Sequence, residues 1–332
     1  MADSRDHAIG IDLGGTTIKV ALVEREAGIL RKASLDSEAG SGPVRVLDRI
    51  AEGVQRVLSA AEGWPALCGI GIGAPGAVSL DRTTVTKPPN FPGWDEVHLP
   101  NQLARRLGKM GIDVDGPTIV ENDANVAGLG SAFYGAGRPY DSFVMVTLGT
   151  GVGGAIIVDN RLFRGSTGAA GEIGHMSIDY EGPYDRAGVS GAIEAYLGQR
   201  FLSHHARFQL LARDTQLHNT VGHDLEDITP RQLHEAAVAG DPAAIEVLAW
   251  AGHKLGVVLG SVVNLLDIRK IVVGGGVSQA DAYILRPARE TLKRFVIPSM
   301  SEGVEIVRET TGNDVALLGA ARLVFEHLDD QA

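Results

Sequence analysis

Residues 12–19 read Asp-Leu-Gly-Gly-Thr-Thr-Ile-Lys and place a pair of glycines between two apolar runs. Ile9 to Ile11 lead into the turn and Ile18 to Val23 follow it, so the segment predicts a β-hairpin rather than a strand that passes into a helix. A glycine turn can approach a phosphate closely because it has no Cβ atom, and its amides and threonine hydroxyls can donate to phosphate oxygens. A plain type I′ hairpin turn stays open as the alternative for Gly14-Gly15.

The chain after this hairpin has the pattern of an α/β domain. Apolar residues recur at helical spacing between Leu47 and Leu58. A strand over residues 68–72 follows and ends in the turn Gly73-Ala74-Pro75-Gly76. The same theme then repeats: a strand at 118–120, a polar cluster, a helix, and a second glycine hairpin over residues 143–158.

The last third of the chain has two further helices. A long helix with one apolar face over residues 245–266 delivers a strand at 271–273 that ends in Gly274-Gly275-Gly276, and a helix at 316–327 closes the chain. We expect three parts: an N-terminal α/β lobe at 1–117, a larger α/β lobe at 118–312, and a C-terminal segment, 313–332, that packs back on the first lobe. Two such lobes suit a nucleotide held in a cleft between them.

The second glycine turn also satisfies the pattern G-x-G-x-x-G, at Gly149-Thr150-Gly151-Val152-Gly153-Gly154. In a dinucleotide-binding fold this motif opens a helix, whereas the following Ala155-Ile156-Ile157-Val158 is mostly β-branched and predicts a strand. The similar match at residues 71–76 contains Pro75 and also leads into no helix. We therefore exclude an NAD site at both places.

The composition narrows the classes of partner. The 332 residues carry a formal net charge of −11, which argues against a nucleic acid or another polyanion. The one cysteine, Cys68, can form neither an intramolecular disulfide nor a multi-cysteine metal site. The first residues have no apolar signal-peptide core, and residues 143–158 are broken by glycines and read as two strands rather than a membrane span. We expect a cytoplasmic protein that acts on a small molecule and has no membrane partner.

Two polar clusters interrupt the apolar pattern. Glu121-Asn122-Asp123 stands where a strand ends and a helix begins, a place where α/β proteins present polar groups to a ligand. Capping of the helix by Asn122 or Asp123 stays open as the alternative. Glu172, His175 and Glu194 form a second cluster in a glycine-rich region, and several such side chains are what a sugar needs.

Five motifs together resemble the ROK family of repressors and sugar kinases, which includes bacterial glucokinases, fructokinases and N-acetylhexosamine kinases. They are D-L-G-G-T-T-I-K at 12–19, E-N-D-A-N-V-A-G at 121–128, the turn at 148–154, G-E-I-G-H at 171–175 and the glycines at 274–276. The resemblance runs in order along essentially the whole chain. It implies an actin-like, ribonuclease-H-like ATPase fold with two lobes around a central cleft.

The resemblance assigns a role to each motif. Asp123 would be the general base that accepts the proton of the attacking sugar hydroxyl during in-line phosphoryl transfer from ATP. Asp12 would meet Mg²⁺ through water. The residues that would bind the sugar are Asn90, Asn122, Asp123, Glu172, His175 and Glu194. The residues that would bind ATP are Gly14, Gly15, Thr16, Thr17, Lys19, Gly149, Thr150, Gly151, Gly153, Gly154, Gly275 and Gly276.

One departure from the family pattern concerns zinc. Many members carry three cysteines after G-E-I-G-H, in a C-x-C-G-x-x-G-C zinc site, and this chain has Asp185, Ala187 and Ala192 at those positions. A structural zinc ion needs four nitrogen or sulfur ligands, so we predict no zinc. His175 then needs a neighbouring group to fix its ring. A hydrogen-bonded core histidine without a sugar contact stays open as the alternative.

The resemblance implies an ATP-dependent hexose kinase of the cytoplasm, with D-glucose as the expected acceptor and glucose 6-phosphate as the product. Fructose, mannose or an N-acetylhexosamine stays open as the acceptor, because hexoses differ in the orientation of single hydroxyls. Polyphosphate stays open as the donor, although the chain has no long basic stripe. The resemblance also suggests a homodimer or homotetramer.

Two hypotheses from another class compete with a kinase. A sugar-responsive transcriptional regulator of this family carries a helix-turn-helix domain before the first glycine turn, whereas eleven residues precede Asp12 here. A non-catalytic sugar sensor has no need of Asp123 or of two glycine hairpins. Both hypotheses are disfavoured on these grounds.

Overall fold

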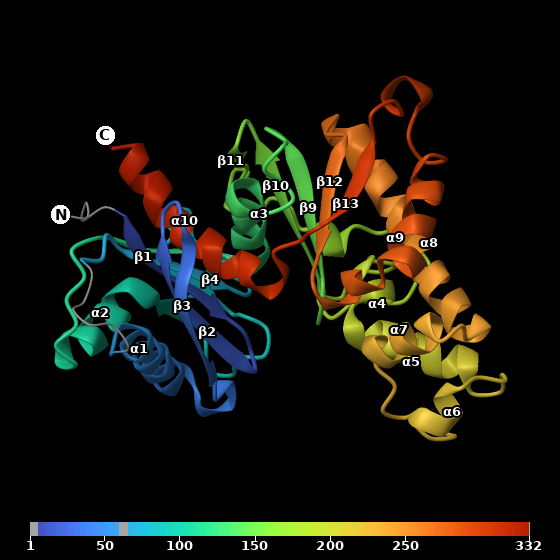
Figure 1. Ribbon diagram of the computed structural model, residues 1–332, viewed down its shortest axis with the longest axis horizontal. Helices are drawn as coiled ribbons and strands as arrows, with labels where there is room; N and C mark the ends of the chain where they lie inside the picture. Colours follow the sequence, from blue (N-terminus) through green and yellow to red (C-terminus); the bar gives the residue numbers. More distant parts are fainter. Residues whose placement is uncertain (1–5, 60–65, 332) are drawn as a thin grey trace. The chain divides into compact units, whose positions relative to one another are not determined.

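The computed structural model describes residues 6–59 and 66–331, which fold into two compact units (Figure 1). The first unit is made of residues 1–141, 156–171 and 313–332, and the second of residues 142–155 and 172–312. This division differs from the predicted boundary between residues 117 and 118. The reason is that the strand at 118–122 pairs with the strand at 70–74 and so belongs to the sheet of the first unit.

A five-stranded sheet forms the centre of the first unit, with the order β3-β2-β1-β4-β8. Its strands are β1 (His7–Leu13), β2 (Thr17–Glu24), β3 (Gly28–Asp36), β4 (Ile70–Ala74) and β8 (Thr118–Asn122). Neighbours among β1, β2 and β3 are antiparallel, whereas β4 runs parallel to both β1 and β8. The predicted hairpin around residues 12–19 is β1-β2, and β3 was not predicted.

Helices cover both faces of this sheet because successive side chains of a strand point to opposite sides. Ile9 and Ile11 share an apolar core with α1 (Pro43–Ser59) and α2 (Leu99–Lys109). Ala8 lies on the other side, in a core with α10 (Val315–Asp329). In Figure 1, α10 crosses the sheet beside α3 (Asp123–Tyr134). The first unit is thus a three-layer α/β/α structure.

The backbone of helix α10 lies in direct contact with the backbone of the sheet and with that of α3. A Cβ atom on Gly71 of β4 would lie 1.7 Å from the carbonyl oxygen of Ala320, and one on Gly10 of β1 would lie 2.1 Å from another carbonyl oxygen of α10. A Cβ atom on Gly319 of α10 would lie 1.7 Å from the carbonyl oxygen of Val126 in α3. Only glycine fits such contacts, so these positions fix how the three elements pack.

A small antiparallel sheet with the order β5-β6-β7 also belongs to the first unit. Its strands are β5 (Ala77–Val78), β6 (Thr84–Thr86) and β7 (Glu96–His98). It follows the end of β4 and precedes α2 in the chain. It therefore occupies the region between the predicted turn at residues 73–76 and the helix that starts at Leu99.

Most of a second five-stranded sheet, with the order β11-β10-β9-β12-β13, belongs to the second unit. Its strands are β9 (Phe143–Leu148), β10 (Val152–Val158), β11 (Arg161–Leu162), β12 (Lys270–Gly274) and β13 (Glu305–Arg308). β12 runs parallel to both β9 and β13, and β10 continues past Ala155 into residues of the first unit, where it pairs with β11. The predicted hairpin over 143–158 and the predicted strand at 271–273 correspond to β9-β10 and β12.

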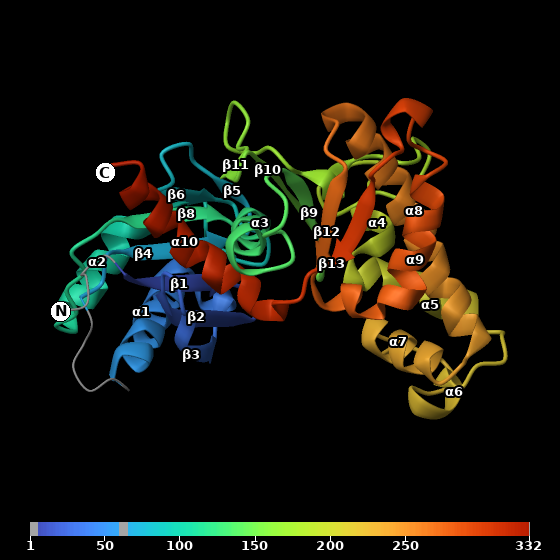
Figure 2. The same cartoon turned by 45° about the horizontal axis from the view of Figure 1, so that its top comes forward.

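Six helices complete the second unit. They are α4 (Glu194–Leu197), α5 (Gln199–Leu210), α6 (Leu217–Thr220), α7 (Pro230–Val238), α8 (Pro242–Leu266) and α9 (Asp281–Leu292). Figure 2 shows α8 and α9 beside β12 and β13, with α5, α6 and α7 gathered at one end of the unit. Among residues 6–59 and 66–331, α8 alone is long and apolar enough for a membrane span, and 61% of the qualifying window is buried inside the structure.

Replacement of Gly71 by alanine tests the backbone packing of α10. The new methyl group would meet the carbonyl group of Ala320, and relief of that clash requires the helix and the sheet to separate. We expect Gly71→Ala to lower the free energy of unfolding by about 3 kcal/mol, measured by urea unfolding followed by circular dichroism. Gly40→Ala is the matched control, because a Cβ atom there has nothing within 4 Å. Equal unfolding midpoints for the two variants would contradict the close packing.

Candidate active site

The first glycine turn, between β1 and β2, is not of type I′. That turn needs a positive φ at both central residues, and neither Gly14 nor Gly15 has one. The glycines permit close contacts instead. The N–H of Gly14 donates to the carbonyl oxygen of Thr17 at 3.0 Å, and a Cβ atom on Gly15 would lie 3.1 Å from the Cβ atom of Asn90. The type I′ alternative is therefore wrong, and Asn90 lies directly against the predicted phosphate turn.

Ser37 supports this turn from the end of β3, a residue that the sequence analysis did not predict. Its hydroxyl donates to the carbonyl oxygen of Gly15 at 2.8 Å, and its N–H donates to that of Thr16 at 2.9 Å. Ser37 has no exposed surface, whereas Thr16 is exposed. The carbonyl groups of Gly15 and Thr16 thus both accept hydrogen bonds from a buried residue. A serine after a strand carries no sequence signal of such a role.

The carboxyl ends of three parallel strands bring polar residues into one row. Asp12 of β1 is the register partner of Gly73 of β4, and Gly73 is the partner of Glu121 of β8. Asn122 ends β8 and Asp123 begins α3. At this edge α/β sheets present side chains to a ligand. The structure therefore gathers Asp12, Asn122 and Asp123 at one edge of the first unit.

Asn122 caps the helix α3. Its Oδ1 accepts from the N–H of Ala124 at 2.9 Å and of Asn125 at 3.3 Å, and its Nδ2 donates to the carbonyl oxygen of Gly76 at 3.3 Å. The capping alternative is therefore confirmed for Asn122. Asp123 is exposed at the first position of the helix, where the helix dipole stabilises a carboxylate.

Asp12 and Lys19 form an ion pair across the β1-β2 hairpin. Nζ of Lys19 lies 2.8 Å from Oδ2 of Asp12, and the two residues are register partners. The lysine predicted to bind ATP and the aspartate predicted to meet Mg²⁺ thus contact each other. The ion pair holds the ammonium group of Lys19 against the carboxylate of Asp12.

Glu121 is a fully buried carboxylate beside Asn122 and Asp123. Its Oε2 lies 2.7 Å from Nε of Arg164 and 3.2 Å from Nε of Arg82. Its Oε1 accepts from the N–H of Asn122 at 2.9 Å and from Nδ2 of Asn125 at 3.0 Å. Loss of a partner from a buried ion pair is strongly destabilising, so these contacts fix the backbone where β8 passes into α3. The contacts of Arg82 and Arg164 with Glu121 were not predicted, because neither arginine is close to Glu121 in the chain.

The second glycine turn lies between β9 and β10 and contacts Glu194 directly. Oε2 of Glu194 accepts from the N–H of Val152 at 3.0 Å, and a Cβ atom on Gly151 would lie 2.3 Å from the same oxygen. The N–H of Gln199 donates to the carbonyl oxygen of Gly149 at 3.0 Å. Glu194, predicted to bind sugar, therefore also holds the turn predicted to bind phosphate.

The glycines after β12 reach the same turn. A Cβ atom on Gly275 would lie 2.2 Å from the carbonyl oxygen of Leu148, the last residue of β9. Cβ atoms on Gly149 and Gly276 would have nothing within 4 Å. No other atoms cover the backbone on that side of Gly149 and Gly276, so a bound ligand has room to contact it there. The structure brings residues 148–154 and Gly275-Gly276 together, as expected for one binding site.

Glu172 and His175 lie on a 3-10 turn (Ile173–His175) that packs on the start of β10. A Cβ atom on Gly174 would lie 1.9 Å from the carbonyl oxygen of Val152, so the turn touches β10 at backbone distance. Oε2 of Glu172 lies 3.8 Å from Nε2 of His175. Glu172, His175 and Glu194 therefore surround the start of β10 within the second unit.

The ring of His175 is held by Asp185. Nδ1 of His175 lies 2.6 Å from Oδ2 of Asp185, whose side chain has no exposed surface. Burial lowers the pKa of His175, but the hydrogen bond and charge of Asp185 outweigh it and raise the pKa above its usual value. Burial raises the pKa of Asp185, but the bond to His175 and the N–H of Val189 outweigh it and lower that pKa.

The predicted site residues thus form two groups, one in each unit. The group of the first unit is Asp12, Gly14, Gly15, Thr16, Thr17, Lys19, Asn90, Asn122 and Asp123. The group of the second unit is Gly149, Thr150, Gly151, Gly153, Gly154, Glu172, His175, Glu194, Gly275 and Gly276.

Residues 8–327 match the profile of the ROK family. The chain belongs to the ROK family. A glucokinase of Thermotoga maritima is 32% identical over 320 residues, which cover 96% of this ROK protein and 98% of that enzyme. A glucokinase of Streptomyces coelicolor is 32% identical over 328 residues, with 96% and 97% covered. The predicted family membership is confirmed.

Solved structures of ROK proteins agree with the fold. The structure of a ROK family glucokinase from Streptomyces griseus, in complex with glucose and AMPPNP, has a TM-score of 0.82 and is 31% identical, with 96% of this chain and 98% of that chain covered. The ROK hexokinase of Thermus thermophilus has a TM-score of 0.77 and is 28% identical, with 98% and 99% covered. The predicted actin-like α/β fold is confirmed.

The residues of this ROK protein do not fit the family's zinc site. Asp185 stands at the first cysteine position and is hydrogen-bonded to His175, while Ala187 and Ala192 supply only methyl groups at the others. Among residues 6–59 and 66–331, no group of three or more His, Cys, Asp or Glu side chains is arranged to hold a metal ion. The absence of zinc stays a prediction.

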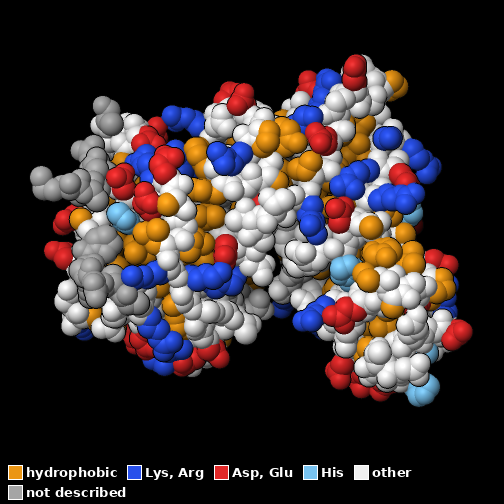
Figure 3. Space-filling model, in the orientation of Figure 1, with side chains coloured by type: hydrophobic (Ala, Val, Ile, Leu, Met, Phe, Trp, Pro, Cys, Tyr) orange, Lys and Arg blue, Asp and Glu red, His pale blue; other side chains and the backbone are white. Residues whose placement is uncertain are grey.

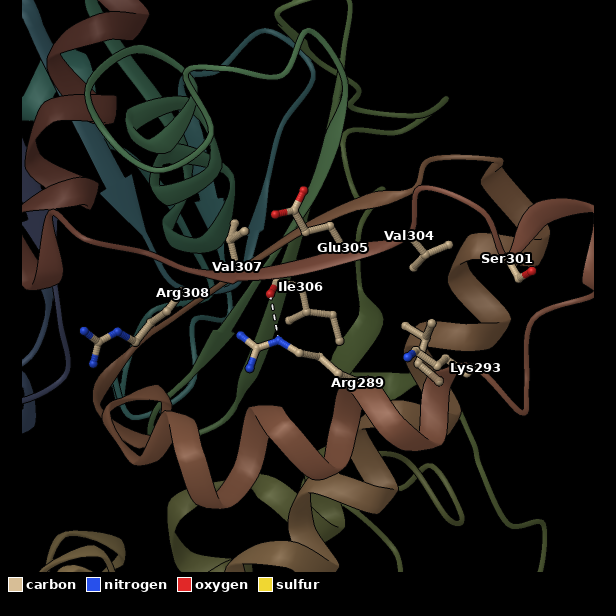
Figure 4. Close-up of a pocket in the computed structure, with 9 residues that line it drawn as sticks. Arg289, Lys293, Ser301, Val304, Glu305, Ile306, Val307 and Arg308 are labelled. Atoms are coloured by element: carbon tan, nitrogen blue, oxygen red, sulfur yellow. Dashed lines mark hydrogen bonds between the residues drawn. The ribbon is translucent and has the colours of Figure 1, made fainter.

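A cavity of about 570 Å³ lies elsewhere in the second unit, between α9 and β13 (Figure 4). Its lining includes Arg289, Lys293 and Arg308 together with apolar residues of β13. Nε of Arg289 donates to the carbonyl oxygen of Ile306 at 3.0 Å. None of the predicted site residues lines this cavity, so it has no part in the site described above.

Metal analysis of the purified protein tests the zinc prediction. Because the ligand positions carry one carboxylate and two methyl groups, we expect a zinc content far below one ion per chain by inductively coupled plasma mass spectrometry. Protein from cells grown with added zinc is the control for metal supply. Treatment with EDTA is expected to leave the thermal unfolding midpoint unchanged. A content near one zinc ion per chain would show the prediction to be wrong.

Proposed function

We propose that this ROK family protein is an ATP-dependent hexose kinase that converts D-glucose to glucose 6-phosphate. The observation that carries the proposal is the exposed carboxylate of Asp123, fixed at the start of α3 beside Asn122 and at the same sheet edge as Asp12. The similarity to glucokinases over nearly the whole chain supports the same activity.

Asp123 acts as the general base. Phosphoryl transfer asks a protein mainly to position the reactants and to stabilise charge, and a carboxylate within hydrogen-bond reach of the sugar hydroxyl suffices to take its proton. Asp123 stands at the N-terminus of α3, where the helix dipole stabilises a negative charge. The buried contacts of Glu121 hold the backbone from which Asp123 projects.

Each unit carries polar side chains of the kind that bind sugar hydroxyls. In the first unit, Asn90 and the remaining N–H of the Asn122 amide would bind sugar hydroxyls. In the second unit, the carboxylates of Glu172 and Glu194 would accept hydrogen bonds from hydroxyls, and His175 would bind one through its imidazole. Nδ2 of Asn122 is also bonded to Gly76, and one oxygen of Glu194 is bonded to Val152, so these two side chains are fixed before a sugar arrives. Fixed partners favour selective recognition of hydroxyl orientation.

Each unit has its own set of residues that would bind ATP. In the first unit they are Gly14, Gly15, Thr16, Thr17 and Lys19, the last of which is paired with Asp12. In the second unit they are the turn at 149–154 and Gly275-Gly276, where the backbone of Gly276 is uncovered. Asp12 would hold Mg²⁺ through water, and the ion would supply positive charge to neutralise the phosphates.

The charged side chains of the surface bear on which partners the protein binds. On the face drawn in Figure 3, Lys and Arg side chains are interspersed with Asp and Glu, which supports a small substrate rather than nucleic acid. We place the enzyme in the cytoplasm, at the entry of glucose into glycolysis, as a dimer or tetramer without a membrane partner.

The test of the function is a phosphorylation assay with ATP and Mg²⁺ across D-glucose, mannose, fructose, galactose and the N-acetylhexosamines. We expect the highest kcat/KM with glucose, and the product phosphorylated at O6 by NMR. Polyphosphate in place of ATP tests the alternative donor. Sugar binding without turnover would favour a sensor or regulator, and no turnover with any hexose would overturn the proposed kinase.

Replacement of Asp123 by asparagine tests the general base. The amide keeps the size of the side chain but cannot take the proton, so kcat is expected to fall by about 10²–10⁴-fold while the thermal unfolding midpoint stays near that of the wild type. Asp115→Asn, at an exposed position before β8, is the matched control and is expected to keep full activity. Near-normal turnover of Asp123→Asn would disprove the role.

A further inference from the structure

We propose that Asp185 is a positioning residue for sugar binding, which holds the imidazole of His175 in one tautomer and one orientation. It stands where many ROK relatives carry the first cysteine of a zinc site, and its carboxylate takes over the orientation of the ring that the metal gives in those relatives. The inference rests on the proposed role of His175 in binding the sugar.

The contact between the two side chains defines the tautomer. Oδ2 of Asp185 lies 2.6 Å from Nδ1 of His175. An ionised carboxylate only accepts hydrogen bonds, so Nδ1 carries the hydrogen and Nε2 is left for another partner. Nε2 lies 3.8 Å from Oε2 of Glu172, the neighbouring residue proposed to bind the sugar. Nε2 of His175 and the carboxylate of Glu172 therefore lie next to each other, in the region proposed to bind the sugar.

Asp185 is itself fixed by the backbone of its loop. Its Oδ1 accepts from the N–H of Ala187 at 2.9 Å and of Val189 at 2.8 Å. It is the one buried residue between positions 181 and 190, all of which the structure describes. Burial of a carboxylate is costly unless hydrogen bonds compensate it, and here both oxygens have partners. The carboxylate is thus held in place, and Oδ2 is left to hold His175.

The loop that carries Asp185 closes through main-chain contacts. Residues 177 and 192 form an antiparallel bridge, as do residues 184 and 190. The N–H of Ile193 donates to the carbonyl oxygen of Met176 at 3.0 Å. These contacts lie on both sides of Asp185 in the chain. The loop therefore has its own means of closure, and the bond from Oδ2 to His175 is available for orientation of the ring.

A double-mutant cycle on the full-length enzyme separates orientation of His175 from general support of the loop. We expect Asp185→Ala to raise the KM for glucose about tenfold, the size of one lost hydrogen bond, with the KM for ATP and kcat changed less than threefold. We expect His175→Ala to raise the KM for glucose at least as much. Asp185→Ala added to His175→Ala is expected to change the KM no further. Additive effects of the two substitutions would overturn the proposal.

Nitrogen-15 NMR of the histidine rings gives a readout that needs no substrate. In protein labelled at histidine, with the His175 signals assigned by their loss in His175→Ala, we expect the Nδ1–H tautomer at a pH where the ring is neutral. Asp185→Ala is expected to shift the signals toward the Nε2–H tautomer, and Asp185→Asn to give an intermediate result. An Nε2–H tautomer in the wild type, or signals unchanged in Asp185→Ala, would overturn the proposal.

Asp179→Ala is the matched control, because Asp179 is an exposed acid of the same loop whose Oδ1 accepts from a backbone N–H, that of Glu181, at 3.1 Å. It is expected to leave both the KM for glucose and the His175 signals unchanged. A wild type that phosphorylates no sugar would overturn the proposed kinase function, while the NMR result would still decide whether Asp185 orients His175.

Discussion

The backbone contact between α10 and the first sheet is the constraint on which the first unit depends. A helix from the end of the chain lies so close to β1 and β4 that glycine is required at Gly10 and Gly71, and Gly319 brings α3 equally close. The strands and α3 cannot shift without the helix. The carboxyl ends of these strands and the start of α3, where Asp12, Asn122 and Asp123 lie, are therefore held rigidly as well.

Local features of the fold could be predicted from the sequence, and features that depend on long-range pairing could not. Glycine turns between apolar runs identified both hairpins, because such turns have a strong local signature. The strand β3 was missed, since only Gly28 and Leu35 are buried in it, and half-buried residues, Arg31 among them, alternate with exposed ones at the edge of the sheet. The pairing of β4 with β8, which places residues 118–122 in the sheet of the first unit, has no local signal in the sequence.

In the candidate site, too, local motifs could be predicted from the sequence and long-range contacts could not. The motifs identified the residues expected to bind the ligands, and the structure gathers them in two groups. Their supporting partners were not predicted: Ser37 behind the first turn, Arg164 on Glu121, and the bond from Val152 to Glu194. Each partner lies far along the chain and belongs to no periodic pattern, so only the folded structure reveals it.

The exchange of cysteine for aspartate at position 185 changes how the loop responds to its chemical surroundings. Thiolates that bind zinc are oxidised by peroxide and lose their metal to chelators, whereas a carboxylate is inert to both. The sole cysteine of the chain, Cys68, is buried in the first unit. If Asp185 orients His175 as proposed, this loop would depend on neither zinc supply nor a reducing environment.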